Sequence, residues 1–125
     1  MKLHEHDRQG LNTITSYGDG FVAVNGVRHT GGLLVMPERA PEHWPVESTA
    51  HVDADRIGHL IALQPELILF GTGSAQHFLH PRELAPLVEA RIGHEVMTTA
   101  SACRTYNILM AEGRRVLAAL LPIEG

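Results

Sequence analysis

The stretch from residue 67 to residue 123 alternates short strand-like runs with helical patterns, and this alternation constrains the fold more than any other feature. The strand-like runs are Leu67–Phe70, His94–Met97 and Val116–Leu121. The first and the last are almost entirely apolar, which is typical of strands covered on both faces. Parallel strands need long crossover connections, usually helices, so this stretch predicts a βαβαβ unit.

Both connecting segments show helix boundaries. Apolar side chains recur on one face over residues 81–92, and Gly93 is expected to end this helix. After the middle strand, Thr98 or Thr99 is expected to cap a second helix that runs to Glu112. The two helices supply the crossovers that the βαβαβ unit requires.

The N-terminal third has a different pattern. Polar and apolar side chains alternate from Leu11 onward, and Asn25–Gly26 is the strongest short-range signal for a two-residue hairpin turn. The strand after this turn is expected over Val27–Thr30, and the apolar run Leu33–Met36 either continues it or begins another strand. This part of the chain predicts antiparallel strands that lead into a mixed sheet with packed helices, which is an α/β fold.

Two segments are expected to be irregular. Residues 1–10 are polar without a periodic apolar face, which predicts a loose arm. Residues 37–50 hold three prolines around Trp44, which predicts a surface loop that Trp44 pins to the core. Asp53 is a good N-cap, and a helix is expected from there to about Leu63.

Length and charge limit the class of protein. A chain of 125 residues with 44% hydrophobic side chains can bury one core, so we expect a single domain over residues 1–125. A net charge of -4 disfavours binding to nucleic acid or anionic lipid, since both need a basic surface. The only cysteine, Cys103, excludes an internal disulfide. Without a signal-like or membrane-spanning apolar run, we expect a soluble cytoplasmic protein that does not insert into membranes.

Four segments of the chain stand in a characteristic order and spacing. They are Phe70–Ser74, Glu95–Met97 with the threonine that follows, Arg104–Asn107 and Ala111–Val116. Together they resemble a known family, named domain of unknown function 498, which includes the adipogenesis-associated domain protein and the mitochondrial respiratory complex I assembly factor 3. The resemblance implies a compact α/β domain without established catalytic activity and, for the mitochondrial relative, a role in building a large complex.

The glycine turn after the first parallel strand is the best candidate site. Ligands of open α/β sheets bind beyond the carboxyl ends of the strands, and the N–H groups of Gly73 and Ser74 can face an anion there. If the neighbouring strand ends beside this turn, the helix that follows adds N–H donors. The ordinary alternatives are a tight turn and a helix cap, and the turn lacks the complete nucleotide-binding motifs. The candidate ligand-binding residues are Gly71, Gly73, Ser74, Thr99 and Arg104.

Other polar residues fit structural roles. The helical period turns Tyr106 and Asn107 toward the sheet, and a buried amide needs partners, so we expect Asn107 to bond the backbone of a loop. Cys103 fits a small core side chain. The histidine pairs, such as His77 and His80, lack the cysteines or the HExxH frame of a metal site. We therefore expect neither metal, cofactor nor catalytic residue.

Two functions remain open from the sequence. The first is a non-enzymatic protein-interaction or assembly role with a protein partner, which would use an apolar patch near Trp44 or an exposed sheet edge. The alternative is a binder of, or an enzyme acting on, a small anionic ligand in the crevice beyond the parallel strands. We favour the first because no base and nucleophile stand together in a recognisable motif. The sequence leaves the oligomeric state open.

Overall fold

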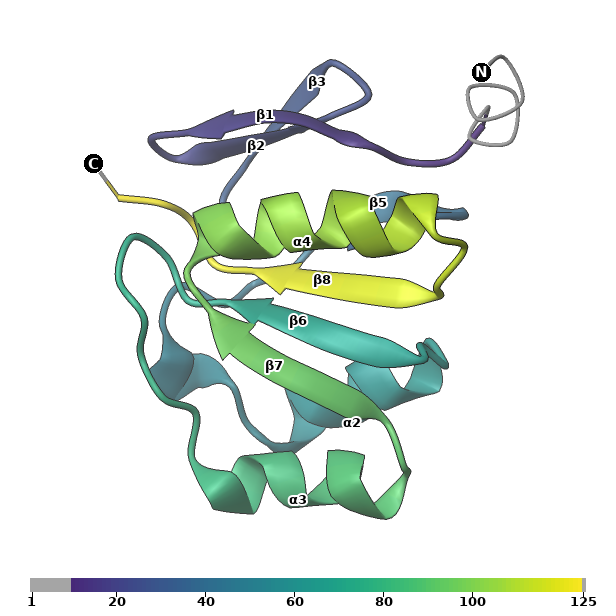
Figure 1. Cartoon of the computed structure of the whole chain (residues 1–125). Helices are drawn as coiled ribbons and strands as arrows, with labels where there is room; N and C mark the ends of the chain where they lie inside the picture. The colour runs from purple at the N-terminus through teal and green to yellow at the C-terminus, as the bar shows by residue number, and fades with distance from the viewer. Residues whose placement is uncertain (1–9, 125) are drawn as a thin grey trace.

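The computed structural model describes residues 10–124, so almost all of the expected N-terminal arm lies outside the described residues. These residues form two sheets and three α-helices (Figure 1). The smaller sheet contains β1 (Ile14–Gly18), β2 (Phe21–Val24) and β3 (Val27–Thr30), in that order and antiparallel. Asn25 and Gly26 have φ angles of 52° and 84°, as a two-residue turn of this hairpin requires. The predicted antiparallel hairpin is confirmed.

The larger sheet is mixed. Its strands are β4 (Leu33–Met36), β5 (Arg39–His43), β6 (Leu67–Gly71), β7 (Gly93–Met97) and β8 (Val116–Leu120), in the order β5-β4-β8-β6-β7. The parallel part is the predicted βαβαβ unit, in which β6 lies between β7 and β8 with all three strands in the same direction. Gly71 pairs with Met97 on one side and with Leu120 on the other, so three strand ends meet at one edge.

The proline-rich segment departs from the predicted loop, because it contains a strand. β5 pairs with β4, and it is one of the two edge strands of the sheet. The register shifts between Leu34 and Met36, opposite the part of β5 that contains Pro41. A proline is tolerated at an edge or a bulge because no neighbouring strand needs its missing N–H. The prediction of a loop over residues 37–50 was wrong for this strand and for the short helix η1 (Thr49–His51).

The three helices lie where the sequence predicts them, except that α3 ends earlier than expected. Asp53 caps α2 (Ala54–Ala62) by accepting a hydrogen bond from the Arg56 N–H at 3.0 Å. α3 (Pro81–Glu89) stops before Arg91, which adopts a φ of 60°. The prediction that Gly93 ends this helix was therefore wrong, because Gly93 already begins β7. The third helix, α4, spans Thr99–Ala111.

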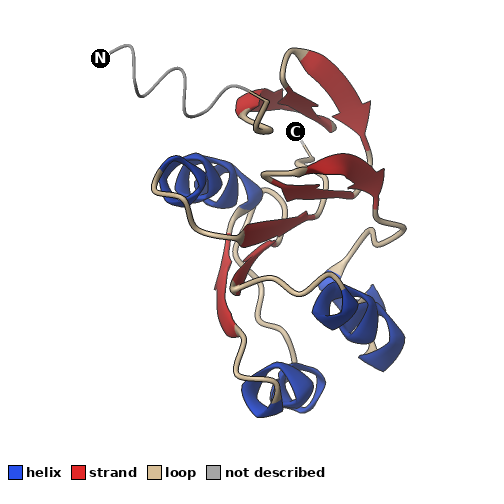
Figure 2. Cartoon of the chain, turned by 90° about the vertical axis from the view of Figure 1, so that its right-hand side faces the viewer, coloured by secondary structure: helices blue, strands red, loops and turns tan. Residues whose placement is uncertain are grey.

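Helices cover both faces of the larger sheet (Figure 2). α2 and α3 lie on one face, where Ile57 and Leu87 pack with Ile68 and Phe70 of β6. α4 lies on the other face and also contacts the smaller sheet, so it separates the two sheets (Figure 1). Its buried face includes Tyr106. One core cluster thus joins side chains of both sheets through α4.

Polar bonds from α4 fix the smaller sheet. The Asn107 side chain accepts a hydrogen bond from the Ile14 N–H at 2.9 Å and donates to the Ile14 carbonyl at 2.8 Å. The Tyr106 hydroxyl donates to the Asn12 carbonyl at 2.8 Å. The backbone role predicted for Asn107 is found, although its partner is the first residue of a strand and not a loop. These bonds set the register between α4 and β1.

We expect Asn107→Ala to lower the free energy of unfolding by about 1–3 kcal/mol, because both backbone groups of Ile14 lose their partner. Ile108→Ala is the matched control on the same helix: its side chain is 59% exposed, and its effect should stay within about 0.5 kcal/mol. Urea unfolding measures both variants. Equal effects of the two substitutions would contradict this role of Asn107.

Candidate functional site

The predicted neighbours at the carboxyl ends of the strands are joined by direct hydrogen bonds. The Thr99 hydroxyl accepts from the Gly73 N–H at 2.8 Å and donates to the Leu121 carbonyl at 2.7 Å. The Thr99 N–H in turn donates to the Gly73 carbonyl at 3.0 Å. Thr99 is fully buried. Its hydroxyl and the Gly73 N–H are therefore used within the protein.

Gly71 lies against the start of α4 without room for a side chain. A Cβ at this position would come within 2.8 Å of the Thr99 Cα and 3.0 Å of a Leu120 methyl group. The glycine thus serves close packing between a strand end and a helix start. At this point the crevice that the sequence predicts is closed.

The rest of the turn is held by its own polar groups. The Thr72 hydroxyl donates to the Ala75 carbonyl at 2.8 Å and accepts from the His77 N–H at 3.1 Å. The Ser74 hydroxyl accepts from the Glu124 N–H at 2.9 Å and also donates to the Glu124 carbonyl. Ser74 therefore fastens the C-terminal segment to the turn.

Arg104 lies away from the turn. Its guanidinium donates to the Tyr17 hydroxyl at 2.7 Å and to the Ser101 hydroxyl at 3.3 Å, so it bridges α4 and β1. The cap of α4 is Thr98, whose hydroxyl accepts from the Ser101 N–H at 3.2 Å. Of the predicted ligand-binding residues, the structure brings Gly71, Gly73 and Thr99 into contact, places Ser74 beside them and leaves Arg104 outside.

A hollow of about 420 Å³ lies next to this turn, and we name it the carboxyl-end hollow. Of the predicted residues, Gly73 and Ser74 line it, whereas Gly71, Thr99 and Arg104 do not. Its charged side chains, Glu47 and Glu124, are acidic and would repel an anion. The remaining lining residues are Ser48, Thr49, Thr72, Ala75, His77, Leu121 and Pro122.

The nucleophilic side chain of α4 is buried in the core. Cys103 is 1% exposed, and burial raises the pKa of its thiol to about 12, with Arg104 acting weakly in the opposite direction. Burial also raises the pKa of the Tyr106 hydroxyl. A thiol in this environment stays protonated at neutral pH, and only the thiolate is a strong nucleophile. Cys103 is thus a core side chain, as expected.

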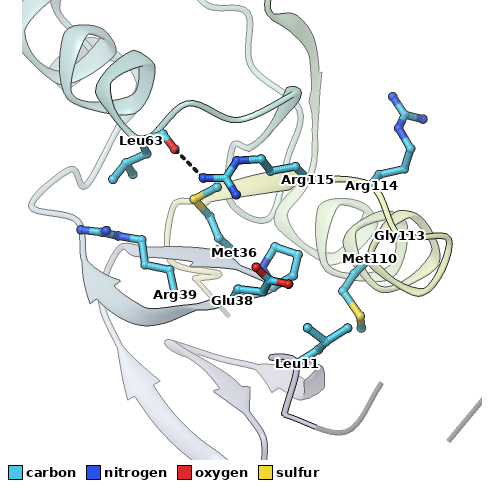
Figure 3. Close-up of a pocket in the computed structure, with 10 residues that line it drawn as sticks. Leu11, Met36, Glu38, Arg39, Leu63, Met110, Gly113, Arg114 and Arg115 are labelled. Carbon is cyan, nitrogen blue, oxygen red and sulfur yellow. Dashed lines mark hydrogen bonds between the residues drawn. The ribbon is translucent and has the colours of Figure 1, made fainter. Parts of the chain in front are cut away.

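A second hollow, of about 440 Å³, lies at the opposite ends of the parallel strands (Figure 3). We name it the amino-end hollow. Its charged lining residues are Arg39, Arg114, Arg115 and Glu38. Sequence reasoning missed it, because its residues come from four separate parts of the chain. Its other lining residues are Leu11, Met36, Pro37, Leu63, Met110 and Gly113.

The arginines of the amino-end hollow differ in their partners. Arg115 donates to the carbonyls of Gln64 at 2.7 Å and of Leu63 at 3.3 Å (Figure 3 draws the latter). Arg114 pairs with Glu66 at 2.9 Å, and the pKa of Glu66 is lowered by hydrogen bonds from the Arg115 N–H and the Arg114 side chain. In the sequence, the two adjacent arginines after Gly113 are the feature that points to a cationic site. The residues that surround them in the fold lie far away in the chain, so the hollow itself could not be predicted.

Outside the two hollows, the expected surface features were an apolar patch near Trp44 and an exposed sheet edge. Trp44 is 2% exposed and packs in a core cluster, so it holds its segment to the core as predicted, and its own side chain adds nothing to an apolar surface patch. The edge strand β7 is covered at one point, where the Gln76 amide donates to the Val96 carbonyl at 3.1 Å. Within residues 10–124, no three acidic, histidine or cysteine side chains form a metal-binding group. Across the same residues, no helix has the length and apolar character that crossing a membrane requires.

The family model described as "Protein of unknown function (DUF498/DUF598)" matches residues 14–121. The chain belongs to this family. The resemblance seen in the sequence is therefore confirmed. An uncharacterized protein from Rhodobacter capsulatus is 41% identical over 126 residues, which cover 100% of this chain and 96% of that protein.

The fold of this chain is similar to that of solved structures. A crystal structure of a Bordetella parapertussis protein matches with a TM-score of 0.86 and 47% identity, covering 90% of this chain and 97% of that one. A solution structure from Bordetella pertussis, described as an Mth938-like domain, matches with a TM-score of 0.81 and 39% identity, covering 92% and 88%. These matches confirm the predicted α/β fold class.

The relatives include proteins named for an assembly role. NADH dehydrogenase [ubiquinone] 1 alpha subcomplex assembly factor 3 of Mus musculus is 32% identical over 114 residues. The match covers 90% of this chain and 61% of the mouse protein. The chain thus spans about three fifths of the length of that relative.

We expect Gly71→Ala to lower the free energy of unfolding by about 1–3 kcal/mol, since the added methyl group meets backbone at the start of α4. The same change at Gly58, in the middle of α2 with open space around it, should instead stabilise the protein by up to about 1 kcal/mol. Thermal or urea unfolding of the two variants gives the sign. A stabilising or neutral Gly71→Ala would show that the strand end is not packed against α4.

Alkaline pH should destabilise the protein through Cys103. The unfolded thiol ionises near pH 9, while the folded thiol stays protonated to about pH 12, so the free energy of unfolding falls as pH rises through this interval. Urea unfolding at pH 8 and pH 10 should show a fall about 1 kcal/mol smaller in Cys103→Ala than in the parent. The packing cost of the substitution is the same at both pH values. It therefore cancels when the change in the free energy of unfolding between pH 8 and pH 10 is compared for the two proteins. An identical fall in both proteins would contradict burial of the thiol.

Proposed function

We propose that this chain is a protein-binding, assembly-factor-like domain without catalytic activity of its own. The observation that carries the proposal is the likeness to assembly factor 3, which extends over 90% of this chain. Relatives of this identity keep the same core, and a shared fold alone would not fix a function. The proposal therefore also needs support from the site.

The geometry of the strand ends supports a binding domain over an enzyme. The polar groups expected to face a ligand bond one another instead, through Thr99 and Gly73. Glu47 and Glu124 give the neighbouring hollow an acidic lining, which is unfavourable for the anionic ligand of the alternative. Cys103 is buried and protonated. These features leave the surface, and not a catalytic centre, as the place where the chain acts.

The finer proposal concerns the partner and the compartment. The mouse relative is named as an assembly factor of NADH dehydrogenase, and we propose that this chain likewise binds a subunit or a second factor of a membrane-bound NADH dehydrogenase before its assembly is complete. We propose that it does so from the cytoplasm. The low cysteine content and the burial of Cys103 support a reducing compartment.

The test is capture in the source cells. A photo-reactive amino acid is placed at exposed positions on different faces, at Glu38, Val88 and Ile108, and native lysates are irradiated and analysed by mass spectrometry. We expect one position to give a reproducible product with the same protein, and the other positions to give much less of it. Recovery of the chain alone from all three positions would contradict the proposal.

A deletion strain tests the finer proposal. We expect cells without the chain to accumulate less assembled NADH dehydrogenase on native gels, while the amounts of its messenger RNAs stay unchanged. Re-expression of the chain should restore the complex. Normal amounts of assembled complex in the deletion strain would contradict the NADH dehydrogenase assignment while leaving protein binding intact.

A further inference from the structure

We propose that the amino-end hollow is the docking site for a partner protein, and that it takes a segment with an acidic side chain next to an apolar one. The inference rests on the proposed protein-binding function and adds the surface and the chemistry of the partner. It starts from a contrast in charge. The whole chain has a net charge of -4, yet this hollow is lined by three arginines and one glutamate.

The three arginines contribute unequally. Arg114 is paired with Glu66 at 2.9 Å, and Figure 3 shows its side chain turned away from Met36 and Glu38. Among residues 10–124, the acidic partner of Arg39 is Glu42 at 3.7 Å, and the Arg39 side chain is 55% exposed. A pair this long and exposed is worth little, so Arg39 keeps most of its capacity to bind a carboxylate.

Arg115 is held in place by neutral groups. Its guanidinium donates to the carbonyls of Leu63 and Gln64, just beyond the end of α2. These carbonyls orient the side chain without cancelling a full charge, although the partial negative charge of a helix end offsets part of it. A fixed guanidinium loses little conformational freedom when it binds a carboxylate. Arg115 therefore supplies a preorganised cationic group, and Arg39 an adaptable one.

Apolar side chains form the rest of the hollow. Met36 and Met110 are almost fully buried and belong to the two core clusters, while Leu11 and Leu63 are partly buried beside them. Methionine side chains adapt to apolar groups of different shapes. The volume of about 440 Å³ suits a few side chains of a partner segment. The combination of an apolar floor and a cationic rim fits an apolar anchor with a neighbouring carboxylate.

Glu38 makes the hollow selective. It is exposed on the turn between β4 and β5 and faces the same space as the arginines. A second acidic group of a ligand would approach this carboxylate and be repelled. The arrangement is thus unfavourable for a polyanion such as nucleic acid, and favourable for a protein segment with one well-placed acid.

The test uses short random peptides displayed on phage and selected on the intact chain. We expect the selected peptides to share Asp or Glu beside Leu, Phe or Met. A fluorescent copy of the best peptide should bind Arg39→Glu about tenfold more weakly, because one attractive charge pair becomes repulsive. Arg82→Glu, the same change on α3 outside the hollow, should leave the affinity unchanged, and Glu38→Gln should raise it.

Changes in the peptide complete the test without any risk to folding. Replacing its acid by Asn or its apolar anchor by Ser should each weaken binding, and higher salt should weaken only the parent peptide and not the Asn version. Amide signals of Arg39, Gly113 and Arg115 should shift on titration, whereas those of Gly73 and Ser74 should not.

Several results would overturn the inference. The selection could enrich no peptides, or basic ones. Arg39→Glu and Arg82→Glu could weaken peptide binding equally, or the amide shifts could be confined to the carboxyl-end hollow. The hollow could also bind decanoate, a fatty acid with a carboxylate and an apolar chain, and no peptide. The outcome is separable from that of the proposed function. If photo-crosslinking captures a partner but the peptide test fails, the chain binds protein through another surface. If no partner is captured and no peptide is selected, both fail.

Discussion

One buried hydroxyl group connects the parts of this fold that lie far apart in the sequence. The Thr99 side chain bonds the turn after β6 and the backbone just after β8, and it does so from the first residue of α4. Three backbone segments therefore share one side chain at the place where an open α/β sheet usually binds its ligand. Removing a partner from a buried bond of this kind costs the full desolvation of the group that is left. The fold depends on this closure, and the closure decides what the strand ends can do.

The two ends of the parallel strands consequently have different characters. At the carboxyl ends, polar groups satisfy one another and the neighbouring hollow is acidic. At the amino ends, Arg115 and Arg39 border an apolar floor; Arg115 is held by neutral carbonyls and Arg39 by a long pairing with Glu42. A side chain that is satisfied within the protein stabilises the fold, while a charged group without a full counter-charge remains available to a partner. This division supports a protein-binding role at the amino ends.

Local sequence patterns predicted most of the elements, because they depend on neighbouring residues. Asp53 as a cap, Asn25–Gly26 as a turn and the apolar run of β8 each act within a few positions. β5 was missed because Pro41 argues against a strand, and only its place at the sheet edge makes the strand tolerable.

The candidate site was harder to predict, because it depends on contacts across long separations. Arg104 was expected near the turn, yet the hydroxyl of Tyr17 holds it on β1, and no local pattern links these two residues. Thr99 and Gly73 were correctly expected to be neighbours, since both follow adjacent parallel strands. Whether such neighbours face a ligand or bond one another depends on small differences in the positions of their atoms. A pattern of residue types does not contain this information.

Hydrogen exchange of the Gly73 amide reports whether the Thr99 hydroxyl closes the strand ends. If the Thr99 hydroxyl closes the strand ends, this amide should exchange as slowly as the amides of the central strand β8, and Thr99→Val should accelerate it far more than those of β8. Exchange of the Gly73 amide at the rate of an unprotected peptide in the parent protein would contradict the account, since the turn would then be open to solvent and to a ligand.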